Sequence, residues 1–158
     1  MASFDKAIAK VLQYEGGYVF NPADPGGETK YGISKRSYPA YNIKNISLDT
    51  AKTLYKLDFW PLIKGDEIKS QKIANNLLDF AVNAGPKAAI KVVQKRLTVA
   101  ADGICGPQTI AAINQEPPDA LNKRLVQERI CFYFSCVEVD RKKECFLKGW
   151  IKRASEFV

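Results

Sequence analysis

Apolar residues recur along most of this chain with the spacing of an α-helix. The first apolar face consists of Phe4, Ala7, Ile8, Val11 and Leu12. Further helices are expected over 47–59, 71–84, 87–97, 107–113, 120–139 and 143–156. Strand-like sequence is confined to 18–20 and 30–33, which we expect to form a small hairpin. The pattern therefore predicts a mainly α protein.

The predicted helix over 71–84 is apolar around most of its circumference, so it should be central and buried. Asn76, Asp79 and Asn83 nevertheless form a polar stripe along one side of it. Buried polar groups need hydrogen-bond partners. Either these three side chains satisfy neighbouring groups of the protein, or they line a groove and bind a polar ligand such as a sugar.

A carboxylate stands where the first helix is expected to end. Glu15 is followed by Gly16 and Gly17, either of which suits a helix C-cap, so we expect Glu15 in the last helical turn at the rim of a cleft. A negative charge there is disfavoured by about 0.3–1 kcal/mol, which would help to keep the acid protonated. The equally weighted alternative is a solvated glutamate beside two capping glycines. The chain has no histidine, so a general acid must come from another residue type.

Composition narrows the function further. The 158 residues are 46% hydrophobic and 26% charged, as in globular proteins, and carry a net charge of +7 that favours polyanionic partners. The basic residues are scattered and no zinc-finger or RNA-binding motif accompanies them, so we do not expect nucleic acid as a partner. No apolar run is long enough to cross a membrane and no signal peptide is evident. Cys105, Cys131, Cys136 and Cys145 lack metal-ligand spacing, so we predict mostly buried, reduced thiols, no metal and no cofactor.

Several motifs occur in an order that resembles one enzyme family. They read EGGY at 15–18, NPADPGGETKYGIS at 21–34, FW at 59–60 and DFAVNAG at 79–85. Together they resemble the family 108 glycoside hydrolases, which are N-acetylmuramidases of the lysozyme-like superfamily. KAAIKVVQKRL, DGICGPQTIAAIN and FLKGWIKR, further along, are similar to the predicted peptidoglycan-binding domain that follows in that family. The resemblance implies a lysozyme-like helical fold with a small β-hairpin near the active site. It divides the chain into a muramidase domain at 1–85 and a helical peptidoglycan-binding domain, packed against it, at 86–158.

The resemblance also implies roles for individual residues. Glu15 would be the general acid that cleaves the β-1,4 bond between N-acetylmuramic acid and N-acetylglucosamine. Asp24 and Thr29 would complete the catalytic group, although Asp24 could equally be a turn residue before a proline. The candidates for stacking on sugar rings, each of which could instead belong to the core, are Tyr18, Tyr31 and Trp60.

We therefore expect a monomeric peptidoglycan hydrolase that resembles phage endolysins or secretion-linked hydrolases, with glycan strands as its partner. It would be made in the cytoplasm and act in the periplasm or cell wall after release by a holin-like or other route. A lytic transglycosylase on the same fold is the nearest alternative. A non-catalytic wall-binding or secretion-accessory protein is the alternative from another class.

Overall fold

A computed structural model of the chain describes residues 1–14, 16–20 and 27–158. Within these ranges the α-helices are α1 Phe4–Leu12, α2 Leu48–Asp58, α3 Gln71–Ala84, α4 Pro86–Arg96, α5 Pro107–Gln115, α6 Pro118–Val139 and α7 Glu144–Ser155. Short 3-10 helices lie at Ile43–Asn45, Gly65–Glu67 and Arg141–Lys143. The strands β1 Val19–Phe20, β2 Glu28–Lys30 and β3 Ile33–Ser34 form one small antiparallel sheet in the order β1-β2-β3. The predicted mainly α architecture is confirmed.

Helix α3 is the centre of the fold. It begins at Gln71, where the Ser70 hydroxyl accepts a hydrogen bond from the backbone N–H of Ile73, and it packs against α1, α4 and α6. Its side chains Ile73, Leu77 and Leu78 are almost fully buried. The sequence predicted both the bounds and the burial of this helix.

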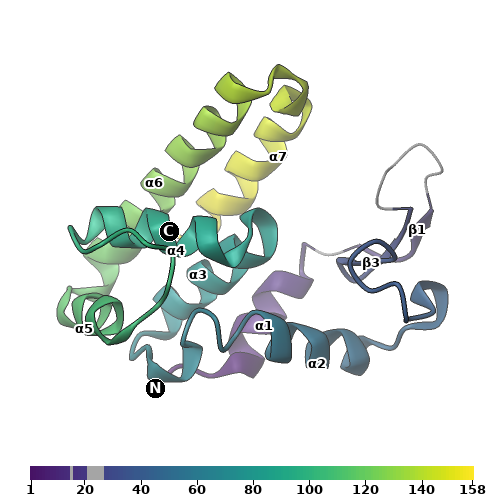
Figure 1. Cartoon of the computed structure of the whole chain (residues 1–158), viewed down its shortest axis with the longest axis horizontal. Coiled ribbons are helices and arrows are strands. Elements are labelled where there is room, and N and C mark those ends of the chain that lie inside the picture. The colour runs from purple at the N-terminus through teal and green to yellow at the C-terminus, as the bar shows by residue number, and fades with distance from the viewer. Residues whose placement is uncertain (15, 21–26) are drawn as a thin grey trace.

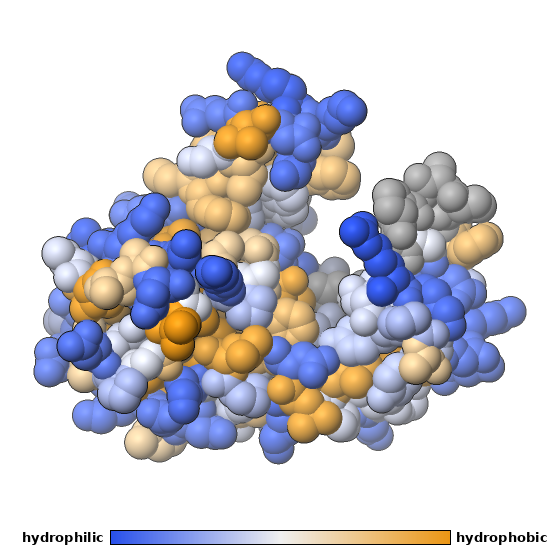
Figure 2. Space-filling model, in the orientation of Figure 1, coloured by the Kyte–Doolittle hydropathy of each residue, from blue (hydrophilic) through white to orange (hydrophobic). Residues whose placement is uncertain are grey.

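Two projections leave the helical body. Helices α6 and α7 form an antiparallel hairpin on one side, and the β-sheet stands near the N-terminal end of α2 on another side (Figure 1). The surface is notched between the hairpin and the sheet (Figure 2). A polymer lying in this notch would have one wall from each half of the chain.

The two predicted domains share their interior. Only Gly85 separates the end of α3 from the start of α4. One cluster of buried side chains includes Ile8 and Leu78 from the first segment together with Val93 and Leu125 from the second. No linker separates the two segments, and a continuous core joins them.

The sequence-based prediction of the first helix was wrong at its end. Helix α1 stops at Leu12 with Gln13 as its C-cap, so it does not extend to position 15 and is not capped by Gly16 or Gly17. Glu15 itself lies outside the described residues.

The predicted hairpin is in fact a three-stranded sheet. Tyr31 and Gly32 both have positive φ, at 52° and 75°, and they connect Lys30 to its partner Ile33 as a two-residue turn. Turns of this hand match the twist of antiparallel strands, and this one folds β3 back onto β2.

The four cysteines all lie in the described part of the chain and are free thiols. Cys105 is buried, and this burial raises its pKa to about 11. Cys131 and Cys145 are exposed, so the prediction of mostly buried thiols was wrong for these two. Cys131 lies on α6 and Cys145 on α7, the two helices of the projecting hairpin. Among the described helices, none combines the length and apolar character needed to span a membrane.

Candidate active site

The residue before Glu15 is held by the end of the chain. The Tyr14 hydroxyl donates a hydrogen bond to Glu156, and its ring lies 6.3 Å, centroid to centroid, from that of Phe157. The Arg153 guanidinium carbon lies 5.1 Å from the centre of the Tyr14 ring. Burial and the bond to Glu156 raise the pKa of Tyr14 to about 12, so this phenol stays neutral. Helix α7 and the turn after it thus fix one neighbour of Glu15.

The residue after Glu15 is held by the sheet. The backbone N–H of Tyr31 donates to the carbonyl of Gly16 over 3.2 Å. The carbonyl of Tyr31 in turn accepts from the Tyr55 hydroxyl of α2 over 3.0 Å. The chain around position 15 is therefore anchored to α7 on one side and to the β-turn on the other. Glu15 and Asp24 themselves lie outside the described residues.

The sheet collects three other residues predicted for the site. Thr29, on β2, pairs with Val19 of β1 and is half-buried. Tyr31 is half-buried in the turn that follows β2. Tyr18 precedes β1 and is exposed, and its hydroxyl donates to Glu28 over 2.9 Å. That hydrogen bond is the main reason why the pKa of Tyr18 is raised. A threonine hydroxyl and two tyrosine rings thus lie on or beside the element that holds Gly16.

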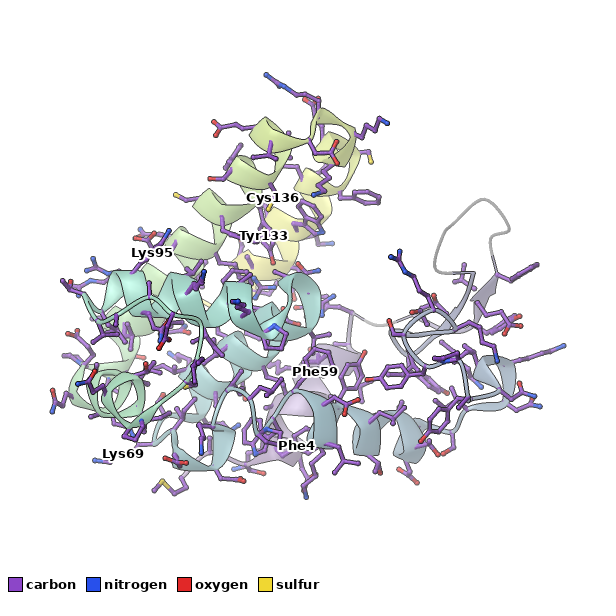
Figure 3. All side chains as sticks on the ribbon, viewed as in Figure 1. Phe4, Phe59, Lys69, Lys95, Tyr133 and Cys136 are labelled. Carbon is purple, nitrogen blue, oxygen red and sulfur yellow. The ribbon has the colours of Figure 1, made fainter. Side chains whose placement is uncertain are left out.

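Trp60 does not join this group. It is only 2% exposed, its ring packs edge-on against Phe4 with centroids 5.5 Å apart, and its indole N–H donates to Asp66 over 2.9 Å. Figure 3 shows Phe4 in the helical body, apart from the sheet. The prediction that Trp60 stacks on a sugar was wrong because the ring is enclosed in the core.

Asp79 is also buried, and arginines surround it. Its carboxylate accepts from Arg129 Nη2 over 2.5 Å and from Arg153 Nη2 over 2.7 Å, while Arg153 Nε lies 2.9 Å from Oδ1. Asp79 and Arg129 are both fully buried. Burial of a charge requires such pairing. The prediction that Asp79 contacts a sugar was wrong, since its oxygens are occupied within the protein.

Asn76 behaves in the same way. It is 2% exposed, donates to Asn122 over 3.1 Å and accepts from Arg129 Nη1 over 3.3 Å. Of the two readings of the polar stripe, internal hydrogen bonding therefore holds for Asn76 and Asp79, and sugar binding by Asn76 was also a wrong prediction.

Asn83 differs from the other two because it is only half-buried. Its side-chain oxygen accepts from the Tyr133 hydroxyl over 2.7 Å, and Tyr133 also accepts from Arg129 Nε over 2.7 Å. Burial is the main cause of the raised pKa of Tyr133. Asn83 thus links the buried network to an open surface.

Sequence reasoning missed Arg129, Arg153 and Glu156 as part of this arrangement. The only local signal was Arg129, a cation within the apolar face formed by Leu125, Val126 and Tyr133 of α6. No group of three metal-ligating side chains occurs among the residues that the structure describes.

Comparison with known proteins identifies both halves of the chain. The Glycosyl hydrolase 108 model matches residues 8–85, and the Predicted Peptidoglycan domain model matches residues 88–155. Twelve chains of solved structures match. One of them, from the structure of Brucella abortus SagA, is 31% identical with a TM-score of 0.84, over 98% of this chain and 90% of that chain. The comparison with curated proteins returned no match.

These matches confirm the resemblance and the mainly α, lysozyme-like fold that it implied. The site built around the sheet, α2 and the end of α7 lies in a chain that belongs to glycosyl hydrolase family 108, a glycoside hydrolase that acts on peptidoglycan.

Proposed function

We propose that this protein is an N-acetylmuramidase that hydrolyses the β-1,4 bond between N-acetylmuramic acid and N-acetylglucosamine, with Glu15 as the general acid. One observation carries the proposal. The two residues that flank Glu15 are anchored separately, Tyr14 by Glu156 and Arg153, and Gly16 by Tyr31. A general acid needs such positioning, because it must reach the leaving oxygen within hydrogen-bond distance.

The proposed chemistry follows from the roles that two carboxyl groups play in glycoside hydrolysis. Glu15 donates its proton to the bridging oxygen, which leaves as the 4-hydroxyl of N-acetylglucosamine, while positive charge develops at C1 of N-acetylmuramic acid. Water adds at C1 and gives its proton to a carboxylate of the site, which creates a new reducing end on N-acetylmuramic acid. Asp24, nine positions after Glu15, is the candidate for the carboxylate opposite Glu15. Thr29 presents a hydroxyl from β2 and is a candidate to orient that water.

The test compares wild type with Glu15→Gln on isolated murein. Glutamine keeps the size of the side chain and cannot act as the acid, so we expect turbidity to fall with wild type and to stay constant with the variant. Glu128→Gln is a matched control that should keep wild-type activity, because Glu128 is an exposed glutamate on α6 outside this site. Equal turbidity loss with Glu15→Gln and wild type would remove Glu15 from the mechanism.

Product masses separate hydrolysis from transglycosylation. Hydrolysis adds one water per bond and leaves reducing ends, whereas a transglycosylase leaves lighter anhydro sugars. Binding to murein without any release of sugar would instead favour a wall-binding protein without catalysis.

A further inference from the structure

A pocket opens where the α6–α7 hairpin meets the end of α3. Its volume is about 330 Å³, within the range of small-molecule sites. It lies on the hairpin that forms one wall of the notch, and Figure 3 shows Tyr133 and Cys136 between the two helices. The side chains that matter here are Asn83, Phe132, Tyr133, Cys136, Lys143 and Trp150.

Aromatic rings form the body of the pocket. Trp150 is half-buried. Its ring is stacked on that of Phe146, with centroids 5.8 Å apart, and is tilted by 30° against that of Tyr133, with centroids 5.1 Å apart. Phe132 packs edge-on against Tyr133 at 5.9 Å. Rings braced in this way keep a fixed orientation, and a flat aromatic surface suits the apolar face of a sugar ring.

Polar groups stand at two points of this aromatic surface. The Asn83 oxygen is taken by the Tyr133 hydroxyl, which turns the amide nitrogen the other way. Among the described residues, none accepts a hydrogen bond from this amide nitrogen. Lys143 lies at the mouth with a side chain 46% exposed, and its nearest carboxylate, Asp140, is 3.9 Å away. The pocket therefore offers amide N–H donors and an ammonium group that a ligand can reach.

We propose that this pocket is a subsite for a muropeptide, in which an N-acetylated sugar lies on Trp150 and a carboxylate of the stem peptide pairs with Lys143. The acetamido oxygen or a ring hydroxyl would accept from the Asn83 amide. Stacking, an amide donor and a cation together match a sugar that carries an acidic peptide. A neutral glycan would leave Lys143 without a new partner, so the pocket favours the peptide-bearing unit. The proposal rests on the proposed function only for the identity of the polymer.

The pocket is connected to the candidate active site through the buried network. Tyr133, at its floor, accepts from Arg129, and Arg129 shares Asp79 with Arg153. Arg153 covers the ring of Tyr14, the residue before Glu15. A muropeptide in the pocket would thus sit on side chains whose positions are fixed relative to the residue that flanks the proposed acid.

Cys136 provides a readout that does not depend on catalysis. We would alkylate wild-type protein with iodoacetamide and follow each cysteine by peptide mass. The ligands would be the GlcNAc–MurNAc disaccharide bearing a tetrapeptide, or N,N′-diacetylchitobiose. The disaccharide lacks the bond proposed to be cut, so it is not consumed. We expect the muropeptide to slow alkylation of Cys136 at lower concentration than chitobiose does. Cys131, exposed on the same helix, serves as the internal control and should be unaffected.

Two variants locate the contacts. Trp150→Leu should weaken protection by both ligands about tenfold. Lys143→Gln should weaken protection by the muropeptide up to about fivefold and remove its advantage over chitobiose. Lys142→Gln, with the same charge change one residue away, should have no effect. Because Lys143 is exposed, its variant should fold normally even if Trp150→Leu does not.

The results separate this proposal from the proposed function. An alkylation rate of Cys136 that neither ligand changes would overturn the subsite, even if the protein cleaves murein. Equal effects of Lys142→Gln and Lys143→Gln would overturn the assignment of the carboxylate contact. Protection of Cys136 in a protein that releases no sugar would leave the subsite intact and reject hydrolysis.

Discussion

Replacement of Asp79 by asparagine should destabilise the protein strongly. Asparagine has nearly the same shape, so it leaves the packing of α3 in place and removes only the charge. That charge is shared by Arg129 and Arg153 at 2.5 and 2.7 Å. Without it, Arg129 remains fully buried beside a neutral amide, and Arg153 loses its bidentate partner at a site where it is 13% exposed.

The expected magnitude follows from this burial. Loss of one partner of a buried ion pair costs about 3–5 kcal/mol, because the remaining charge is left uncompensated. Domains of this size unfold with about 5–15 kcal/mol, so the variant would lose a large part of its stability. At about 2–4 °C per kcal/mol, the Tm should fall by about 6–20 °C.

Urea unfolding followed by circular dichroism would measure the change. Asp119→Asn is the matched control, because Asp119 pairs with Lys72 at 2.7 Å but is 81% exposed, and its variant should unfold at the urea concentration of wild type. A loss below about 1 kcal/mol for Asp79→Asn would refute the reasoning. In that case hydrogen bonds to neutral groups, and not charge compensation, hold α6 and α7 on α3.

Three further predictions concern packing and titration. Gly65→Ala should lower the free energy of unfolding in urea by about 1–3 kcal/mol, because the added Cβ would overlap the buried Trp60 ring. Gly149→Ala, in open space on a helix, should raise it by about 0.5–1 kcal/mol. Similar values for the two variants would contradict the packing argument. The raised pKa of Tyr14 means that the unfolded chain loses this proton first, so stability should fall between about pH 10 and 12, and less steeply in Tyr14→Phe. Cys105, with its pKa of about 11, should be alkylated by iodoacetamide only after denaturation, and rapid labelling of the Cys105 peptide in the native protein would show that this thiol is accessible.

The helical part of the fold was predictable because its signals are local. Helix α3 has the predicted bounds, Gln71–Ala84, since periodic apolar residues, a serine cap and a terminal glycine all lie within its own sequence. The third strand was missed because its signal is a backbone conformation, the positive φ of Tyr31, which the residue type does not favour.

The candidate site was harder to predict because its contacts are distant in sequence. Asp79 is separated from Arg129 by 50 positions and from Arg153 by 74. The helical periodicity identifies a polar stripe on α3, but it does not indicate which arginine or lysine will pair with that stripe. Trp60 shows the same limit, because an aromatic residue has the same pattern whether it packs in a core or binds a sugar.

The single residue between α3 and α4 has a consequence for how such an enzyme works on a wall. A binding module on a long tether lets its glycosidase search many bonds around one attachment point. Here the shared interior prevents the two halves from moving independently. The distance between the bond that is cut and the site bound by the second half is therefore fixed. A chimera that exchanged residues 86–158 for a foreign segment would remove the arginines that pair with Asp79 and the glutamate that bonds Tyr14. The two halves are therefore not interchangeable modules.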